Sequence, residues 1–508
     1  MFRRQLATVL VFGGMFTLAF PAWAAIKLPA LISDHMVLQS DMAAPIWGWA
    51  EPGEEVTVAI ADQSAQATAD KDGKWQVKLP KLAAGGAHTL TVRGKSNEIV
   101  VKDVLVGEVW LGSGQSNMAM VVSSCNNAGE EIAAADFPKI RMFTVTSTAA
   151  DSAQADCEGS WQVCSPQTAG RFSASLYFCG REIHKALGVP VGLINSSVGG
   201  TPIESWISAD VQEKSPELKE FVAAAQAEAD RFDPVAAQAK YEKDLAQWEV
   251  AAKAAKAAGR PAPRKPIDQV ANRARKGTIG GLYHGKIAPL VPYAMRGAVW
   301  YQGEANSNPA KSRYYEHQLP LLVTSWRAAW GSEFPFAWVQ LPNFDGLGGH
   351  WPVVREAMLK SLKLPKTGMA ITIDIGDAKD IHPKNKQDVG KRLAQWALGE
   401  VYGKDGPTSG PLPAGHERRG KDLVLKFSHA DGGLVAKGGE LRGFVVAGAD
   451  KAWKPAAARI EGDQVIVSSP EVAEPVAARY AWENNPVCNL VSGAGLPASP
   501  FRTDNWEP

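Results

Sequence analysis

Several features that would assign this chain to a particular class of protein are missing from its sequence. Its 508 residues have almost no net charge, with 54 Lys and Arg against 53 Asp and Glu. Without a basic excess nothing indicates nucleic-acid binding, and without an acidic excess nothing indicates a solvating tail. No zinc-type spacing of Cys and His and no glycine pattern of a phosphate-binding loop occurs. We therefore predict no metal and no organic cofactor.

Cysteine is scarce, and no cysteine lies in a recognisable nucleophile context. The five residues are Cys125, Cys157, Cys164, Cys179 and Cys488. An odd number leaves at least one thiol unpaired within a monomer. Cys157 and Cys164 stand close together in a polar segment, so we expect them to form a disulfide bond if the chain is exported.

Long apolar runs are absent except at the start of the chain. Arg3 and Arg4 precede an apolar run over residues 6–20. The run is followed by a short segment that ends at Ala24 and has small residues where a signal peptidase needs them. This pattern predicts a signal peptide over residues 1–24. The alternative is an uncleaved membrane anchor, for which the run is short. We expect a secreted or periplasmic protein without membrane contact after cleavage.

The chain is long enough for several domains. Alternating apolar and polar stretches separated by Gly, Pro and Asp predict an N-terminal β-sandwich over residues 25–102. Residues 103–406 alternate strands with helices, which predicts an α/β domain with a mostly parallel sheet. A helical excursion rich in Ala, Glu, Lys and Gln interrupts it at about 209–275. Residues 407–508 are predicted to be a β-rich C-terminal domain.

Polar motifs follow four of the predicted strands in the central domain. They occupy residues 112–118, 195–206, 300–306 and 374–383. Because parallel sheets bind ligands at the carboxyl ends of their strands, we expect these motifs to meet in one site.

Ser116 and His382 are the residues in these motifs best suited to acyl transfer. Ser116 follows Gly114 on a predicted strand-to-helix turn, where a hydroxyl is exposed and backbone N–H groups are free for an oxyanion. His382 stands before a predicted helix, with Asp380 two residues earlier as a carboxylate that can hold one tautomer. The alternatives are a serine that caps a helix and a structural histidine.

The two middle motifs supply groups that support such a reaction. The paired glycines at Gly199 and Gly200 allow close approach of the backbone to a ligand, or simply permit a turn. Gln302 is able to donate a hydrogen bond to an oxyanion. Glu304 is either a general base or a group that orients its neighbours. The alternative for Gln302 and Glu304 together is a buried polar pair that stabilises the end of the strand.

Together the motifs GQSNM, GGTPIE, WYQGE and DIHP resemble the sialate O-acetylesterase family. The resemblance extends to LISDHMVLQ near the start of the chain and to RYAW and GLPA near its end, so that it covers nearly all of the mature protein. The family belongs to the SGNH (GDSL-like) hydrolases. It implies a flavodoxin-like α/β/α sandwich and a serine esterase that acts on an O-acetylated carbohydrate.

The resemblance also implies a role for each motif residue. Ser116 takes the place of the nucleophile, His382 that of the base and Asp380 that of its acidic partner. The oxyanion hole would consist of the N–H groups of Ser116 and Gly199 together with Gln302. Supporting residues would be Glu304, Asn117 and Asp377.

Three positions depart from the family pattern. Lys379 stands where SGNH hydrolases commonly have Asp, three residues before the base, which leaves the partner of His382 open between Asp380 and Asp377. His284 replaces an expected Asn, and Val198 replaces a frequent Trp in the pocket wall.

The substrate stays open at this point between O-acetylated sialic acid and a plant cell-wall polysaccharide such as xyloglucan or xylan, since the fold does not fix the function. Trp206 and Trp351 are either sugar-stacking walls or core residues. Two rival classes are a glycoside hydrolase using Glu304 and Asp380, and a non-catalytic carbohydrate-binding protein. The sequence leaves the oligomeric state open.

Overall fold

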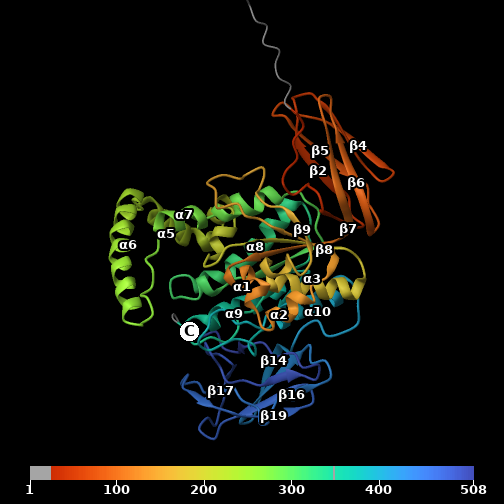
Figure 1. Ribbon diagram of the computed structural model, residues 1–508. Helices are drawn as coiled ribbons and strands as arrows, with labels where there is room; N and C mark the ends of the chain where they lie inside the picture. The colour runs from red at the N-terminus through yellow and green to blue at the C-terminus, as the bar shows by residue number, and fades with distance from the viewer. Residues whose placement is uncertain (1–24, 347–348, 508) are drawn as a thin grey trace, which may run out of the picture.

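The computed structural model describes residues 25–346 and 349–507, which form a central α/β body between two β-rich regions (Figure 1). The predicted signal peptide, residues 1–24, lies outside the described residues. Within them, no helix is both long enough and apolar enough to cross a membrane.

The N-terminal region is built from antiparallel strands, together with β1, which pairs in parallel with β7, and their inward side chains share one hydrophobic core. One sheet pairs β2 with β5, and the other contains β3, β4 and β6. Burial alternates along β5, as expected for a strand with one solvated face. The strands are β1 (Val37–Gln39), β2 (Ala44–Trp49), β3 (Glu55–Ile60), β4 (Gln63–Thr68), β5 (Lys74–Leu79) and β6 (Gly85–Arg93).

Strand β7 (Glu98–Gly114) belongs to both the N-terminal region and the central sheet. Its first part pairs with β6 and alternates between exposed and buried residues, whereas residues 104–114 are all buried. The change in pattern follows the change in surroundings, because a central parallel strand is covered on both faces. The N-terminal region is therefore continuous with the strand that leads to Ser116.

The central sheet has the order β13-β12-β11-β7-β10-β8-β9. All neighbours are parallel except β8 and β9, so an antiparallel edge makes the sheet mixed. The predicted α/β class with additional β-sheet regions is confirmed, although the β8–β9 edge was not expected from the sequence. The strands are β8 (Phe137–Thr144), β9 (Trp161–Cys164), β10 (Val191–Ser197), β11 (Gly297–Tyr301), β12 (Phe336–Val339) and β13 (Thr367–Ala370).

The chain reverses direction across this sheet at β7. It first builds β8 to β10 on one side of β7, and then β11 to β13 on the other side. At such a switch point the connections after neighbouring strands diverge and leave a crevice at the carboxyl ends. Ser116 lies directly after β7 and therefore at this crevice.

Helices cover both faces of the sheet. Helices α3 (Ala174–Leu187) and α10 (Lys386–Trp396) pack side by side on one face, where Phe178 and Leu393 lie in one core cluster. Helices α8 (Tyr315–Trp330) and α9 (Trp351–Lys360) belong to the cluster on the other face.

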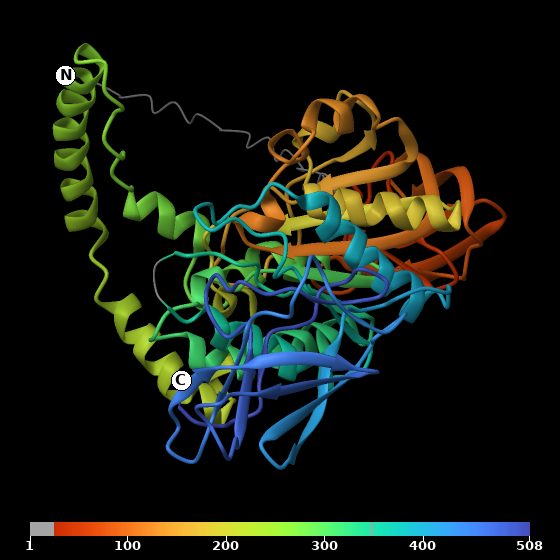
Figure 2. The ribbon, with the colours of Figure 1, turned by 90° about the horizontal axis from the view of Figure 1, so that it is seen from below.

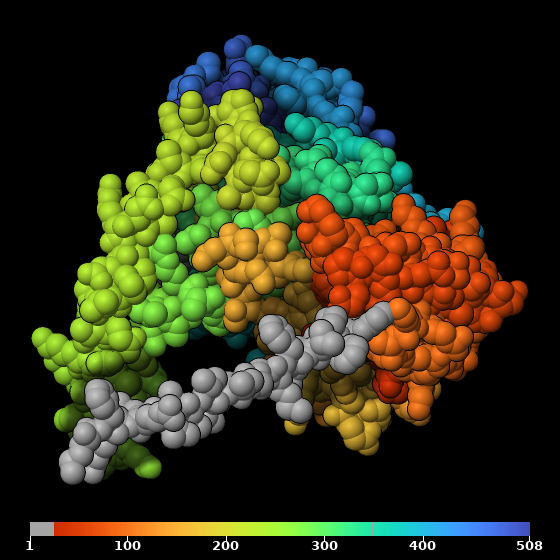
Figure 3. Space-filling view, turned by 90° about the horizontal axis from the view of Figure 1, so that it is seen from above, coloured from red at the N-terminus to blue at the C-terminus, as the bar shows by residue number. Residues whose placement is uncertain are grey.

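A helical insertion interrupts the sheet between β10 and β11 and projects from the body (Figures 2 and 3). In α6 only Ala255 is buried, as expected for a solvated helix without an apolar stripe. The helices are α4 (Ala209–Glu213), α5 (Lys219–Asp230), α6 (Pro234–Ala257) and α7 (Gln269–Lys276).

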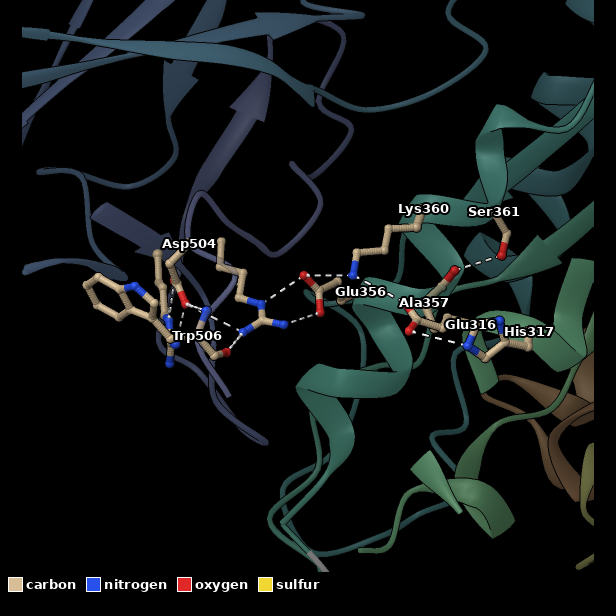
Figure 4. A network of polar contacts seen from close by, with 10 residues as sticks. Glu316, His317, Glu356, Ala357, Lys360, Ser361, Asp504 and Trp506 are labelled. Carbon is tan, nitrogen blue, oxygen red and sulfur yellow. Dashed lines mark hydrogen bonds and ion pairs between the residues drawn. The ribbon is translucent and has the colours of Figure 1, made fainter. Parts of the chain in front are cut away.

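The C-terminal region consists of two four-stranded sheets and a short strand pair around a core of its own. Figure 4 shows its last segment facing Glu356 of α9, whose carboxylate pairs with Arg502 at 2.8 and 2.9 Å. The strands of the two four-stranded sheets are β14 (Leu412–Arg419), β15 (Asp422–Ser428), β20 (Gln464–Ser468) and β19 (Ala457–Glu461) in one, and β18 (Trp453–Pro455), β17 (Phe444–Ala447), β21 (Ala477–Tyr480) and β23 (Phe501–Arg502) in the other. The short pair consists of β16 (Leu434–Ala436) and β22 (Leu490–Ser492).

The predicted disulfide bond between Cys157 and Cys164 is wrong, because all five thiols are free. Cys157 is buried in the core cluster that contains Trp161, whereas Cys164, at the end of β9, is buried in the cluster on the other side. Burial raises the pKa of both thiols to about 12, so neither is a ready nucleophile.

Candidate active site

Ser116 lies at the tight turn that joins β7 to the short helix α1 (Ser116–Ala119). Gly114 makes this turn at φ 136°, and a Cβ added to it would lie 2.1 Å from the carbonyl oxygen of Tyr301. Only glycine fits both the dihedral angle and the space. The turn leaves Ser116 half-buried at the first position of a helix, where N–H groups have no partner within the helix.

The loop after β10 lies directly against Ser116. A Cβ added to Gly199 would lie 3.4 Å from the Cβ of Ser116, and the N–H of Val198 donates to the carbonyl of Gly114 at 3.1 Å. Within residues 25–346 and 349–507, the N–H groups of Ser116 and Gly199 have no hydrogen-bond acceptor. Two unpaired N–H donors therefore lie beside the serine.

Gln302 is fully buried behind these two loops. Its Nε2 lies 2.7 Å from Oδ1 of Asn306 and 3.2 Å from both Oε1 of Gln115 and the carbonyl of Thr201. Its Oε1 accepts from the hydroxyl of Tyr315 at 3.0 Å. Gln302 thus joins the residue before Ser116 to the Gly199 loop.

His382 lies in the loop between β13 and α10, and its side chain is 43% exposed. Burial of the ring lowers its pKa below the usual value, an effect that Lys386 strengthens and Asp380 opposes. The imidazole is therefore neutral at neutral pH, as a general base requires. Within the described residues no hydrogen bond joins His382 to the hydroxyl of Ser116.

Neither predicted carboxylate partner holds the ring of His382 by a hydrogen bond. Oδ1 of Asp380 lies 3.9 Å from Nδ1 and instead accepts the backbone N–H of His382 at 2.9 Å. Oδ1 of Asp377 accepts the backbone N–H groups of Lys379 and Asp380 at 2.8 and 3.2 Å. Asp377 thus shapes the loop, while Asp380 acts on the ring through its charge.

Glu304 and Asn117 connect the serine turn to the histidine loop. Nδ2 of Asn117 donates to Oε1 of Glu304 at 2.5 Å and to the carbonyl of Ile381 at 2.9 Å. Oε2 of Glu304 is buried without a partner, and burial raises the pKa of this carboxyl. Glu304 therefore lies between the two loops as a hydrogen-bond acceptor for Asn117.

Sequence reasoning missed Lys386, which is fully buried beneath the site. Its Nζ donates to Oδ1 of Asn117 and to the carbonyl of Pro383, both at 2.7 Å. One signal was available, because Lys386 occupies the first turn of a predicted helix, where the helix dipole disfavours a cation.

A second unpredicted network supports the Gly199 loop. Glu204 is buried and pairs with Nζ of Lys311 at 2.6 Å, while its other oxygen accepts from Nδ2 of Asn306 at 2.9 Å. Lys276, at the end of α7, donates to the carbonyl of Gly200 at 2.8 Å. The helical insertion therefore contacts the loop beside Ser116.

Trp206 and Trp351 belong to the core, with 0% and 3% of their surface exposed, so neither is a sugar-stacking wall. Trp206 stacks edge-on against Trp300 at 5.9 Å. Val198 is also buried, at 8% exposure, and the ring of His284 packs against Tyr283. No group of three or more His, Cys, Asp or Glu side chains in the described ranges is placed to hold a metal ion.

The combination of fold and site defines a class of protein. A serine on a tight turn, two unpaired N–H donors beside it and a neutral histidine on a neighbouring loop are the groups used in acyl transfer. The site lies at the switch point of a parallel sheet, where ligands bind. The protein therefore has the groups of a serine-dependent acyl-transfer enzyme, the class to which the serine esterases belong.

Comparison with known proteins narrows this class to one family. A family model described as carbohydrate esterase, sialic acid-specific acetylesterase, matches residues 106–239 and 282–399. The sialate O-acetylesterases of Rattus norvegicus and Homo sapiens are each 28% identical to the chain, cover 94% of it, and are themselves covered over 94% and 92% of their lengths. The crystal structure of a carbohydrate acetylesterase from Xanthomonas citri is 36% identical, with a TM-score of 0.81, over 95% of this chain and 100% of that one.

The chain belongs to the sialic acid-specific acetylesterase family of carbohydrate esterases. Both matched segments contain motifs of the site, since the first includes Ser116 and Gly199 and the second includes Gln302 and His382. Family membership implies O-deacetylation of carbohydrate, with an O-acetylated carbohydrate as the substrate.

Proposed function

We propose that the protein removes acetyl groups through an acetyl-serine intermediate. His382 takes the proton of Ser116 while Oγ attacks the acetyl carbonyl carbon. The tetrahedral intermediate then collapses, the bond to the sugar oxygen breaks, and the sugar leaves with the proton from His382. Water activated by the same histidine attacks the acetyl-serine, which releases acetate and restores the hydroxyl of Ser116.

The unpaired N–H groups of Ser116 and Gly199 are the observation that carries this proposal. They would hold the oxyanion, and loss of one such donor typically costs about 100- to 1000-fold in rate. Gln302 is the proposed third donor. Its two amide protons lie near three acceptors, so one of the 3.2 Å hydrogen bonds has to be exchanged for the oxyanion.

Asp380 is the proposed acidic partner of His382. Its carboxylate favours the imidazolium that forms when the base takes a proton, and it acts across 3.9 Å without a direct hydrogen bond. Asp377, Asn117 and Glu304 support the two loops. We also propose that the domain belongs to the SGNH hydrolases. When the edge strands β8 and β9 are left out, the remaining five strands, β10-β7-β11-β12-β13, have the flavodoxin-like order 2-1-3-4-5.

The substrate of the proposed reaction is an O-acetylated sugar that an exported protein would encounter. The names of the mammalian relatives, sialate O-acetylesterase, favour an O-acetylated sialic acid as this sugar. The Xanthomonas citri enzyme has the higher identity and is described more broadly, as a carbohydrate acetylesterase. We keep acetylated xyloglucan or xylan as the alternative substrate, since the fold does not fix the sugar. Either substrate agrees with the secreted or periplasmic location that residues 1–24 predict.

Acetate release from a panel of esters tests this function. The panel contains an aryl acetate, 9-O-acetylated sialic acid, acetylated xylan and acetylated xyloglucan. We expect release from one sugar ester by the wild type and at least a 1000-fold loss in Ser116→Ala, as for other serine nucleophiles. Ser124→Ala, which changes an exposed serine at the end of the next short helix (Val122–Ser124), is the matched control. Full activity of Ser116→Ala, or no release from any ester, would overturn the proposal.

A further inference from the structure

The backbone on both sides of His382 is tied down, although its ring is not. Nδ2 of Asn117 donates to the carbonyl of Ile381 at 2.9 Å, and Nζ of Lys386 donates to the carbonyl of Pro383 at 2.7 Å. These two carbonyls flank His382 in the chain. The ring itself lies 3.9 Å from the carboxylate of Asp380, beyond hydrogen-bond distance.

The two ties are joined to each other and to the serine turn. Nζ of Lys386 also donates to Oδ1 of Asn117 at 2.7 Å, and Asn117 directly follows Ser116. The amide of Asn117 therefore lies between a cation on its oxygen and the carboxylate of Glu304 on its nitrogen. This arrangement fixes the orientation of the amide and allows one side chain, Lys386, to bridge both loops of the site.

Lys386 is an unusual residue for a purely structural tie. It has no exposed surface, it lies in the first turn of α10, and its ammonium lies 5.3 Å from the ring centre of Tyr301. Burial of a cation at a helix N-terminus costs free energy twice, through desolvation and through the helix dipole. A glutamine or a methionine at this position would avoid that cost.

We propose that Lys386 is a positioning residue of the esterase: by tying Asn117 to Pro383 it sets the placement of His382 relative to Ser116. The inference rests on the proposed roles of Ser116 and His382. Lys386 touches neither of them and acts through the backbone of their neighbours. We call the set of Asn117, Ile381, Pro383 and Lys386 the histidine clamp.

The charge of Lys386 gives the clamp a second effect. Titratable groups near Lys386 are Tyr301, Glu304, Asp380, Cys125 and His382. The pKa of Lys386 itself is lowered to about 7, mainly by burial and against the opposite effect of the Glu304 and Asp380 charges. The cation in turn lowers the pKa of His382. Removal of the charge should therefore raise the pKa of His382 and move the acid limb of the pH profile to higher pH.

The variant Lys386→Met distinguishes the positioning role of Lys386 from a purely structural role. It keeps most of the side-chain volume and removes both hydrogen bonds and the charge. We expect kcat on an aryl acetate to fall about 100-fold, as for a misplaced catalytic group, with KM nearly unchanged and the acid limb of kcat/KM at higher pH. Lys386→Gln keeps a donor without the charge, so it should recover part of kcat but keep the shifted limb.

Lys286→Met is the matched control. Lys286 is also buried, at 2% exposure, and its Nζ donates to the carbonyls of Val145 and Ser147 at 2.6 and 2.9 Å, neither of which belongs to the serine turn or the histidine loop. We expect this variant to lose thermal stability as Lys386→Met does, while its kcat and pH profile match those of the wild type.

Two further variants keep the inference open to refutation if Lys386→Met folds poorly. Asn117→Ala breaks the same clamp from the other end. The double variant of Asn117→Ala and Lys386→Gln should lose no more kcat than the worse of its two single variants, because both substitutions disrupt the same clamp. Wild-type kcat and pH profile in Lys386→Gln and Asn117→Ala would overturn the inference while Ser116→Ala stays inactive. Activity in Ser116→Ala would instead refute the proposed function.

Discussion

At the scale of single residues, the site depends on charges that act without direct contact. The ring of His382 is half-exposed and makes no hydrogen bond to Asp380, yet Asp380 and Lys386 shift its pKa in opposite directions. Burial of the ring has the largest effect on this pKa and lowers it, as the lysine also does, so the neutral form prevails. Activity is then expected to fall only as the pH drops below the usual histidine pKa of about 6.5.

Asp380→Asn tests the contribution of this carboxylate. Because its charge raises the pKa of His382, the variant should show the acid limb of kcat/KM at lower pH than the wild type. The loss of kcat at pH 8 should be about tenfold, far below the ~10⁴-fold loss for a hydrogen-bonded triad carboxylate. A pH–rate profile on an aryl acetate measures both quantities.

Asp377→Asn distinguishes the two carboxylates. Its amide oxygen still accepts the backbone N–H groups that Asp377 accepts, so the loop is kept while the charge is lost. If the acid limb moved in Asp377→Asn and stayed in place in Asp380→Asn, the partner of His382 would be Asp377.

At the scale of elements, the turn after β7 decides whether Ser116 is presented at all. Gly114→Ala would place a methyl group 2.1 Å from the carbonyl of Tyr301 at a φ of 136°. The dihedral angle alone costs about 1–3 kcal/mol, and the collision adds to that figure. We expect a thermal unfolding midpoint lowered by at least several degrees and at least a 100-fold loss of activity.

Gly129→Ala provides the comparison for that change. Gly129 lies in α2 (Ala128–Ala133), and an added Cβ would meet no atom within 4 Å. Because alanine favours a helix over glycine, this variant should be up to about 1 kcal/mol more stable than the wild type. Equal stability of both alanine variants would show that the turn tolerates a side chain at position 114.

The hydrophobic patterns of single strands explain how much of the fold could be predicted from the sequence. The strands at residues 191–194 and 297–301 are runs of apolar residues bounded by turn signals, and they became buried parallel strands. Strand β9 could not be found in this way, because it is only the short segment Trp161–Cys164 and pairs only with β8, at the edge of the sheet. The wrong disulfide prediction for Cys157 and Cys164 also follows from missing β9. This strand places Cys164, its last residue, in a different core cluster from Cys157.

The candidate site shows the same division. Ser116 and Gly199 could be predicted because local sequence, a strand followed by glycines, determines their backbone geometry. Lys386, Asn306 and Lys311 could not, because their partners come from distant parts of the chain: Asn117 for Lys386, and Glu204 for the other two. Spacing within one motif carries no information about such contacts.

At the scale of the whole molecule, the C-terminal β region is joined to the catalytic body through a buried guanidinium. Arg355 of α9 is fully buried and donates to the carbonyls of Leu341, Pro342, Glu483 and Asn484, at 2.6 to 2.9 Å. The first two acceptors belong to the catalytic body, and the other two belong to the C-terminal segment. The ion pair of Arg502 with Glu356 adds a second connection beside it (Figure 4).

Arg355→Met should therefore weaken the connection between these two parts. The variant removes a donor from four carbonyls, of which those of Pro342 and Asn484 still accept from Nε1 of Trp351 and from the N–H of Phe344. The carbonyls of Leu341 and Glu483 lose the hydrogen bond that Arg355 donates, and a buried group left unsatisfied costs about 1–3 kcal/mol. We expect the stability of the C-terminal region to fall by about 1–3 kcal/mol, with calorimetry separating its unfolding from that of the catalytic body. Arg459→Met, which removes a half-exposed arginine paired with Glu461 on the C-terminal sheet, should change stability by less than about 1 kcal/mol. If Arg355→Met unfolded in a single transition at the wild-type temperature, the guanidinium would not be what couples the C-terminal region to the esterase.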